Sequence, residues 1–160
     1  MNRRWKMNRI GFVNFWLYDE EEFQFENGRL LLRGQNGSGK SITPQSFIPS
    51  SDRRMEYYFL GEEGKEESTC YLYLEFKKEG EESYRTIGIG QRAKRGRPMD
   101  FWGFLILDGR RIGCDLWLYR ETGSVKIPYD KRDMRQALGE ENLFTDLSLI
   151  HISEPTRLAL

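Results

Sequence analysis

The residues best suited to chemistry in this sequence form one glycine-rich segment, Gly34-Gln35-Asn36-Gly37-Ser38-Gly39-Lys40-Ser41. The segment matches G-x-x-x-x-G-K-[ST], the pattern of a phosphate-binding loop, at every specified position. Glycines lack a Cβ atom, so the backbone can curl around a phosphate group and direct several amide donors toward it. We expect Lys40 to reach the β- and γ-phosphate oxygens and the Ser41 hydroxyl to bind Mg²⁺. The segment therefore predicts a binding site for a nucleoside triphosphate and its magnesium ion.

No residue is assigned a catalytic role, because the acids that such a hydrolase needs are not evident. An enzyme of this type carries an acidic pair at the end of an apolar strand, where it holds Mg²⁺ and orients the attacking water. Asp108 ends an apolar run, but Gly109 follows it, which is typical of a tight turn. Gln91 ends another expected strand, and we interpret it as an edge polar residue, with contact to a metal-bound phosphate as the alternative.

The elements that must position the loop are a strand before it and a helix after it. Leu30 to Leu32 is a short apolar run, which suits a strand at the centre of a sheet and covered on both faces. Ser41 to Ile48 is expected to begin a helix, although Pro44 and Pro49 shorten or damage it.

Around this unit the sequence is rich in expected strands. They cover residues 9–16, 23–25, 70–76, 84–89, 101–107 and 112–118, with turns at 26–28, 78–82 and 108–109. Consecutive strands joined by short polar turns indicate antiparallel meanders rather than βαβ crossovers. Lys131 to Leu138 is the one convincing later helix, and Gly139 is its expected C-terminal cap.

Charge is balanced over the chain, with 25 basic and 25 acidic residues, so any contact with DNA must come from local patches. Two basic clusters are present, and they comprise Arg3, Arg4, Lys6 and Arg9, then Arg92, Lys94, Arg95 and Arg97. We interpret both as solvated surface and hairpin tips, with contacts to DNA phosphates as the weaker reading. The four tryptophans, at positions 5, 16, 102 and 117, are expected to be core or packing residues rather than a platform for nucleobases.

The cellular compartment follows from cysteine usage and hydropathy. Cys70 and Cys114 have no metal-binding spacing, and two unpaired cysteines suit a reducing environment. No apolar run approaches the roughly 20 residues that a membrane-spanning helix needs. We therefore expect a cytoplasmic protein.

The loop and its surroundings resemble the ATPase heads of the SMC, RecF and Rad50-like group, and within it the MukB-related, JetC-like condensin subunits of bacterial Wadjet-type plasmid defence. The segments that carry the resemblance are residues 8–16, 34–41, 45–49 and 52–58. The resemblance covers Met7 to Asp146, which is most of this chain but a small fraction of the length of family members.

The resemblance implies an α/β fold, that of a P-loop NTPase of the ABC/SMC type. This chain would be the N-terminal lobe of the head, with a large antiparallel β portion and few helices. It also implies ATP as the nucleotide, a second head as partner, DNA as the substrate of the parent protein, and a C-terminal lobe that supplies the missing acids and signature loop. Two departures from the family affect the helix behind the loop: Pro44 lies within it, and the stretch between Phe47 and Asp52 is shortened.

We divide the chain into a partial ATPase head lobe, residues 1–146, and a tail, residues 147–160. The tail is unlike the family and is similar to translated sequencing-adapter read-through, so we expect it to be non-native. His151, the only histidine, then has no functional role.

Two other functions remain open from the sequence. One is a small self-contained P-loop phosphotransferase, which needs parallel βαβ units and an internal acid for Mg²⁺. The other is an inert fragment that lacks the neighbours its central strand requires.

Overall fold

The computed structural model describes residues 3–15, 18–33, 35, 60 and 65–145. Its strands are β1 (Trp5–Phe15), β2 (Tyr18–Gln24), β3 (Glu67–Lys78), β4 (Tyr84–Lys94), β5 (Asp100–Ile106), β6 (Tyr119–Thr122), β7 (Val125–Pro128) and β8 (Leu143–Phe144). Its helices are α3 (Lys131–Leu138) and the short 3₁₀ helix η1 (Glu140–Asn142). The loop after Gly34, the expected helix at 41–48 and the tail at 147–160 lie outside these residues, except for Gln35.

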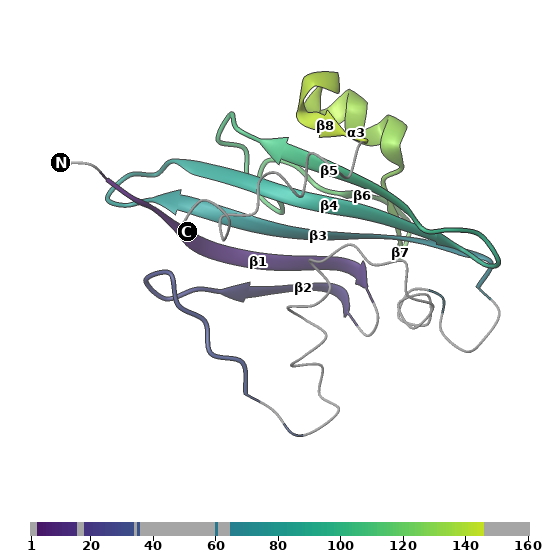
Figure 1. The fold of residues 1–160 in the computed structure, drawn as a ribbon, viewed down its shortest axis with the longest axis horizontal. Coiled ribbons are helices and arrows are strands. Elements are labelled where there is room, and N and C mark those ends of the chain that lie inside the picture. The colour runs from purple at the N-terminus through teal and green to yellow at the C-terminus, as the bar shows by residue number, and fades with distance from the viewer. Residues whose placement is uncertain (1–2, 16–17, 34, 36–59, 61–64, 146–160) are drawn as a thin grey trace.

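The described strands form one large sheet and one small hairpin. The order in the large sheet is β2-β1-β3-β4-β5-β8, and β6 pairs with β7 separately. Every pairing between these strands is antiparallel. Figure 1 shows the long strands lying side by side, with α3 beside the β5 edge. The turns before β4 and β5 each use a glycine with positive φ, 74° at both Gly80 and Gly96, as short connections between antiparallel strands require.

The predicted α/β P-loop NTPase fold is wrong for this chain. Strand accounts for 55% and helix for 11% of the described residues, and the sheet is antiparallel rather than parallel. A parallel pair needs a crossover of a dozen or more residues, whereas β3, β4 and β5 follow one another through short turns. A glycine-rich motif specifies local phosphate chemistry, but the pairing of the strands depends on their connections and on the core.

The sheet buries a separate core on each face. On the first face, Tyr71, Trp102 and Phe104 pack with the segment 112–118 and with α3. On the second face, Phe12, Cys70 and other side chains form another cluster, on which Leu30 packs. Side chains alternate along each strand, so Val13 joins the first core while its neighbour Phe12 joins the second. Both faces of the sheet are therefore covered over part of their area.

Aromatic rings of the first face lie over glycines of the neighbouring strand. Three pairs share this arrangement, and they are Gly11 with Tyr73, Gly88 with Phe104, and Gly90 with Trp102. A Cβ atom added at any of these glycines would come within 2.1 Å of the partner ring. The rings of Trp102 and Phe104 also contact Tyr71 edge-on, with centroids 5.9 and 6.0 Å apart. Glycine at these positions lets large rings lie flat against the sheet.

Helix α3 begins and ends as the sequence predicts. Asp130 is its N-cap and accepts a hydrogen bond from the Asp133 backbone amide at 2.8 Å, while the Asp133 carboxylate accepts one from Asp130 N. Gly139, with φ 86°, ends the helix. Met134 and Leu138, four residues apart, turn one face of the helix into the first core.

Two expected strands are absent from the described residues. Leu30 to Leu32 pairs with no strand, and Leu31 is 70% exposed, so this run is not the sheet centre; β1, β3 and β4 occupy that place. Residues 112–118 form a loop that contains one bridge, between Ile112 and Leu116, rather than a strand paired with β5. The apolar side chains of this loop serve the first core directly, which is why the sequence resembles a buried strand.

Candidate functional site

The predicted phosphate loop is described at one position only. Gln35 is exposed, and Gly34, Asn36, Gly37, Ser38, Gly39, Lys40 and Ser41 lie outside the described residues. The chain approaches the loop from a tight turn at 26–29, where Asn27 and Gly28 have φ angles of 49° and 76°. Leu30 then packs on the second core. The segment before the loop is therefore anchored to the second face of the sheet.

Gln91 lies on this same second face and is not an edge residue. It is 1% exposed in the middle of the sheet, directly opposite Cys70 on β3 and Phe101 on β5. Its interpretation as an edge polar residue is wrong, because β4 is an inner strand of the sheet and β5 pairs with it at Gln91. The alternative interpretation of Gln91, contact with a metal-bound phosphate, stays a prediction. Gln91 and Leu30 lie on the same face of the sheet.

Asp108 has the turn role that the sequence predicts. Its carboxylate accepts hydrogen bonds from the Arg110 backbone amide at 3.0 Å and from Arg110 Nε at 2.8 Å. These bonds hold the pKa of Asp108 below its usual range. In the part of the chain that the structure describes, no three His, Cys, Asp or Glu side chains are grouped so as to hold a metal ion.

The two basic clusters lie at opposite ends of the sheet. The first surrounds the start of β1, where Trp5 is opposite Lys78, and the second surrounds the turn after β4, where Lys94 is opposite Glu67 (Figure 1). Half of these side chains, four of eight, form salt bridges with described acidic residues. The exposed pairs are Arg3 with Glu81, Lys6 with Glu79, and Arg92 with Glu67. The clusters therefore do not merge into one continuous patch for DNA.

Arg9 belongs to a buried ion network that the sequence did not reveal. Arg9 is 4% exposed and Glu75 is fully buried, so the expectation of a solvated Arg9 is wrong. The Glu75 carboxylate accepts hydrogen bonds from Arg9 Nη2 at 2.7 Å, Asn8 Nδ2 at 2.8 Å, Arg111 Nη2 at 2.9 Å and Arg111 Nε at 3.1 Å. One carboxylate thereby ties β1, β3 and the loop at 107–118 together.

The network keeps Glu75 ionised although it is buried. Burial by itself raises the pKa of this carboxyl, but the hydrogen bonds from Arg111 and Asn8 and the charge of Arg9 bring its pKa below the ordinary value of 4.5. The same surroundings affect Tyr73, whose ring lies beneath the Arg9 guanidinium. Burial raises the pKa of Tyr73 to about 12, so its hydroxyl stays protonated at neutral pH.

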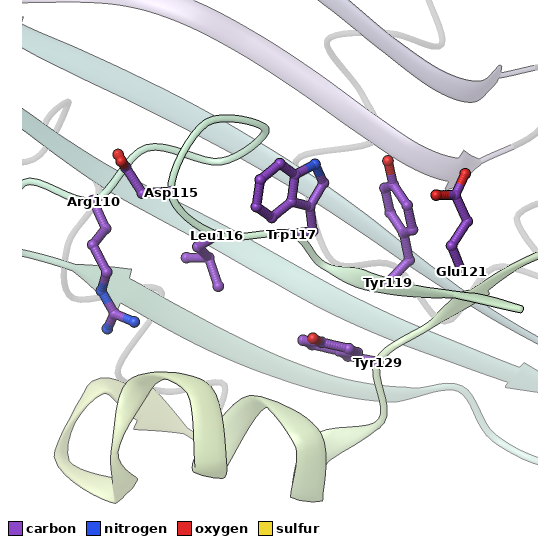
Figure 2. Close-up of a pocket in the computed structure, with 7 residues that line it drawn as sticks. All are labelled: Arg110, Asp115, Leu116, Trp117, Tyr119, Glu121 and Tyr129. Carbon is purple, nitrogen blue, oxygen red and sulfur yellow. The ribbon is translucent and has the colours of Figure 1, made fainter.

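A surface pocket lies on the first-face side of the molecule, beside this network. Its volume is about 400 Å³, and it is lined by Arg110, Asp115, Leu116, Trp117, Tyr119, Glu121 and Tyr129. Figure 2 shows the rings of Trp117, Tyr119 and Tyr129 standing around one opening, with the Glu121 carboxylate beside Tyr119. Trp102 is 1% exposed and confirms the expectation of a core or packing residue, whereas Trp117 is 44% exposed and lines the pocket. Trp16 lies outside the described residues.

Hydrogen bonds to neighbouring elements hold the walls of this pocket. Arg110 Nη1 donates to the carbonyl of Ala137 in α3 at 2.9 Å, and the Tyr71 hydroxyl donates to the carbonyl of Tyr129 at 2.5 Å. The Tyr129 amide donates to the carbonyl of Leu118 at 2.8 Å. The aromatic walls are therefore positioned by the sheet and by α3.

The sequence contained a weak signal for both features. Glu75 interrupts an apolar alternation on β3, after Tyr71 and Tyr73, and an acid at such a position requires a buried partner. Nothing in the sequence identified Arg9 and Arg111 as those partners, since they lie 66 and 36 residues away. The pocket draws its rings from a loop, a hairpin and the approach to α3, and no motif connects these.

Comparison with known proteins adds no relative. No protein-family model and no curated protein matches this chain. Among the described residues, none of the helices has the length and apolar character needed to cross a membrane.

Proposed function

We propose that this chain binds the phosphates of MgATP through residues 34–41, as part of an SMC-like ATPase that acts on DNA in the cytoplasm. The observation that carries the proposal is the match of Gly34 to Ser41 to the phosphate-loop pattern at every specified position. The proposal keeps the ligand and the class of parent protein that the sequence suggests. It places the loop on an antiparallel sheet in place of an α/β fold.

Each residue of the loop has a separate task in this proposal. The backbone amides of 36–39 surround the phosphates, and the Lys40 ammonium neutralises charge on the β- and γ-phosphate oxygens. The Ser41 hydroxyl is a ligand of Mg²⁺, which supplies further charge neutralisation when it is bound. Gln91 is the residue of the described sheet that we assign to the metal or γ-phosphate side of the site, because it is buried on the face where Leu30 is anchored.

Hydrolysis then requires residues from a second lobe. Asp108 is the acid that follows an apolar strand, and both of its carboxylate oxygens already accept hydrogen bonds from Arg110. We assign the missing acids to a C-terminal lobe, and the closing surface to a second head. With the residues divided in this way, one lobe binds the nucleotide, and hydrolysis occurs only after the two lobes assemble.

The test is calorimetric titration of MgATP into the chain combined with its complementary lobe. The expected result is saturable binding that weakens tenfold or more in Lys40→Ala, since a charge-assisted contact to phosphate contributes roughly 1.5–3 kcal/mol. Lys65→Ala is the matched control, because Lys65 is an exposed lysine outside the loop and its loss is expected to leave the affinity unchanged. Absence of binding with the loop intact, or equal affinity in Lys40→Ala, would overturn the proposal.

A second measurement separates the two-lobe proposal from a self-contained enzyme. The isolated chain is expected to show negligible ATP turnover and no transfer of label from ATP to a panel of nucleosides. ATPase activity of the isolated chain that disappears in Lys40→Ala would show that one lobe suffices. That outcome would refute the need for a second lobe while leaving the phosphate loop in place.

A further inference from the structure

We propose that the pocket lined by Trp117, Tyr119, Tyr129 and Glu121 binds an organic ammonium group. This site is independent of the phosphate loop and is formed entirely by described residues. The proposal rests on two observations: the distribution of charge around the pocket, and the state of its aromatic rings. The ligand class is a quaternary or alkylated ammonium, carried either by a small molecule or by a modified lysine of a protein.

The charges around the pocket leave its carboxylates without a basic partner. Three basic side chains are close by, and each is already paired: Arg110 with Asp108, Arg120 with Asp133, and Lys126 with Asp19 and Glu20. Asp115 accepts one hydrogen bond, from the Arg111 backbone amide at 2.8 Å. Within the described part of the chain, neither Asp115 nor Glu121 forms a salt bridge. The lining therefore presents uncompensated negative charge, which favours a cation over an anion.

The rings of the pocket are suited to a cation that is poorly hydrated. Two of them already carry one of the chain's own cations: Lys126 Nζ lies 5.2 Å from the centroid of Tyr119, and the Arg120 guanidinium lies 5.5 Å from that of Tyr129. Trp117 has the strongest aromatic face for this interaction, yet it makes no ring contact, cation contact or side-chain hydrogen bond with any described residue. The lining combines an exposed indole with two carboxylates that form no salt bridge in the described part of the chain, and this combination favours alkylated ammonium groups.

The pocket is rigid enough to act as a preformed site. Arg111 fixes the loop below Trp117 through its two hydrogen bonds to the buried Glu75, and the Tyr71 hydroxyl holds the backbone at Tyr129 by donating to its carbonyl. The Tyr119 hydroxyl donates to Glu20 Oε2 on β2 at 2.9 Å, which holds the third ring. Because the Tyr119 ring and the backbone that carries Trp117 and Tyr129 are held before a ligand arrives, less ordering is needed on binding. The volume of about 400 Å³ is ample for a trimethylammonium group.

The experiment compares choline with its neutral isostere, 3,3-dimethyl-1-butanol, by titration followed in tryptophan fluorescence and by NMR. Choline is expected to bind saturably and at least roughly fivefold more tightly than the isostere, because only the charged group gains the cation–π and carboxylate attraction. Trp117→Ala is expected to weaken choline about fivefold or more, with Trp117→Phe intermediate. Glu121→Gln is expected to weaken choline about two- to fivefold and to leave the isostere unchanged.

Controls separate the pocket from the rest of the surface. Ile127→Ala removes a 52% exposed apolar side chain outside the pocket lining and is expected to leave choline affinity unchanged. A peptide that carries trimethyl-lysine forms the second arm: tighter binding than choline assigns the ligand to a protein, and weaker binding assigns it to a small molecule. Equal binding of choline and its isostere, unchanged affinity in Trp117→Ala, or no saturable binding would overturn the proposal.

Discussion

The two faces of the large sheet are stabilised by different physical means. On the first face, aromatic rings lie flat over glycines, and a buried carboxylate joins two arginines. On the second face, the described core consists of aliphatic and phenylalanine side chains, with Cys70 and the amide of Gln91 among them. Phe12 and Phe15 stack there with centroids 6.1 Å apart, and the positive φ of Asn14, 53°, places both on one side. The first face depends on specific polar geometry, whereas the second depends on apolar burial.

The difference explains where each candidate site lies. Ionic contacts hold a loop and a hairpin over the first face, and their side chains leave a shaped pocket at the surface. The segment before the phosphate loop packs on the second face. Among residues 30–33 and 35, the residue that packs on the core of this face is Leu30. The pocket on the first face is therefore held by ionic contacts and hydrogen bonds, whereas the described segment before the phosphate loop packs on the second face through the apolar side chain of Leu30.

The largest effect is expected for Glu75→Ala, which disrupts the buried ion network of the first face. Replacement by alanine leaves Arg9 buried without its carboxylate, and loss of one partner of a buried ion pair costs about 3–5 kcal/mol. The free energy of unfolding, measured by urea denaturation with circular dichroism, is expected to fall by that amount. A loss below about 1 kcal/mol would show that the network does not stabilise the first face.

Acid conditions provide the control for this variant. The folded-state pKa of Glu75 lies below 4.5, so the unfolded chain takes up the proton first and the contribution of Glu75 is lost as pH falls below 4.5. The free energy of unfolding of the wild type is expected to fall over this pH range because of Glu75, and Glu75→Ala is expected to lack that part of the decrease. Leu72→Ala on the second face is expected to cost about 2–5 kcal/mol while retaining the acid-dependent loss.

A smaller effect tests the rings that lie over glycines. Gly90→Ala places a Cβ atom 2.1 Å from Trp102, and overpacking of this kind costs about 1–3 kcal/mol. Ile89→Val, one residue away on the second face, is expected to cost about 0.5–1.5 kcal/mol through lost burial. Thermal unfolding of both variants gives the comparison. In the Trp102→Phe background the cost of Gly90→Ala is expected to shrink; strictly additive effects would contradict contact with the ring.

The smallest effect concerns α3, which covers part of the first face. Asp130→Ala removes the side-chain acceptor of the Asp133 amide, while the backbone amide of residue 130 can still donate to the Asp133 carboxylate, and it is expected to cost about 1 kcal/mol. Glu140→Ala is the matched control, because no side chain caps η1 and an exposed substitution there changes stability by less than about 0.5 kcal/mol. Equal melting temperatures for the two variants would show that the cap does not stabilise the helix.

Several elements could be predicted from the sequence because their signals are local. The helix at 131–138 is confirmed at both ends, since Asp130 and Gly139 are cap residues at the correct spacing. The meander of β3, β4 and β5 is confirmed from alternating side chains and short polar turns. The prediction of a central strand at Leu30 to Leu32 is wrong, because an apolar run does not specify its packing partners. Leu31 is exposed to solvent.

The candidate sites divide along the same line. The phosphate loop is a contiguous pattern and remains a prediction from sequence, with Gln35 as its only described member. The ammonium pocket has no contiguous pattern, and Trp117 was expected to be a core or packing residue. Gln91 was expected at an edge, because the number of strands beyond β4 is not visible in the residues around it.

By itself, the sequence determined the turns, the caps, the alternation of the strands and the phosphate-binding pattern, since each depends on residues a few positions apart. Only the tertiary structure decided that β1 lies between β2 and β3 in the sheet, that Glu75 lies between Arg9 and Arg111, and that three rings meet at one pocket. These features depend on which segments the core brings together. Short-range preferences of the chain carry no information about partners that lie dozens of residues away.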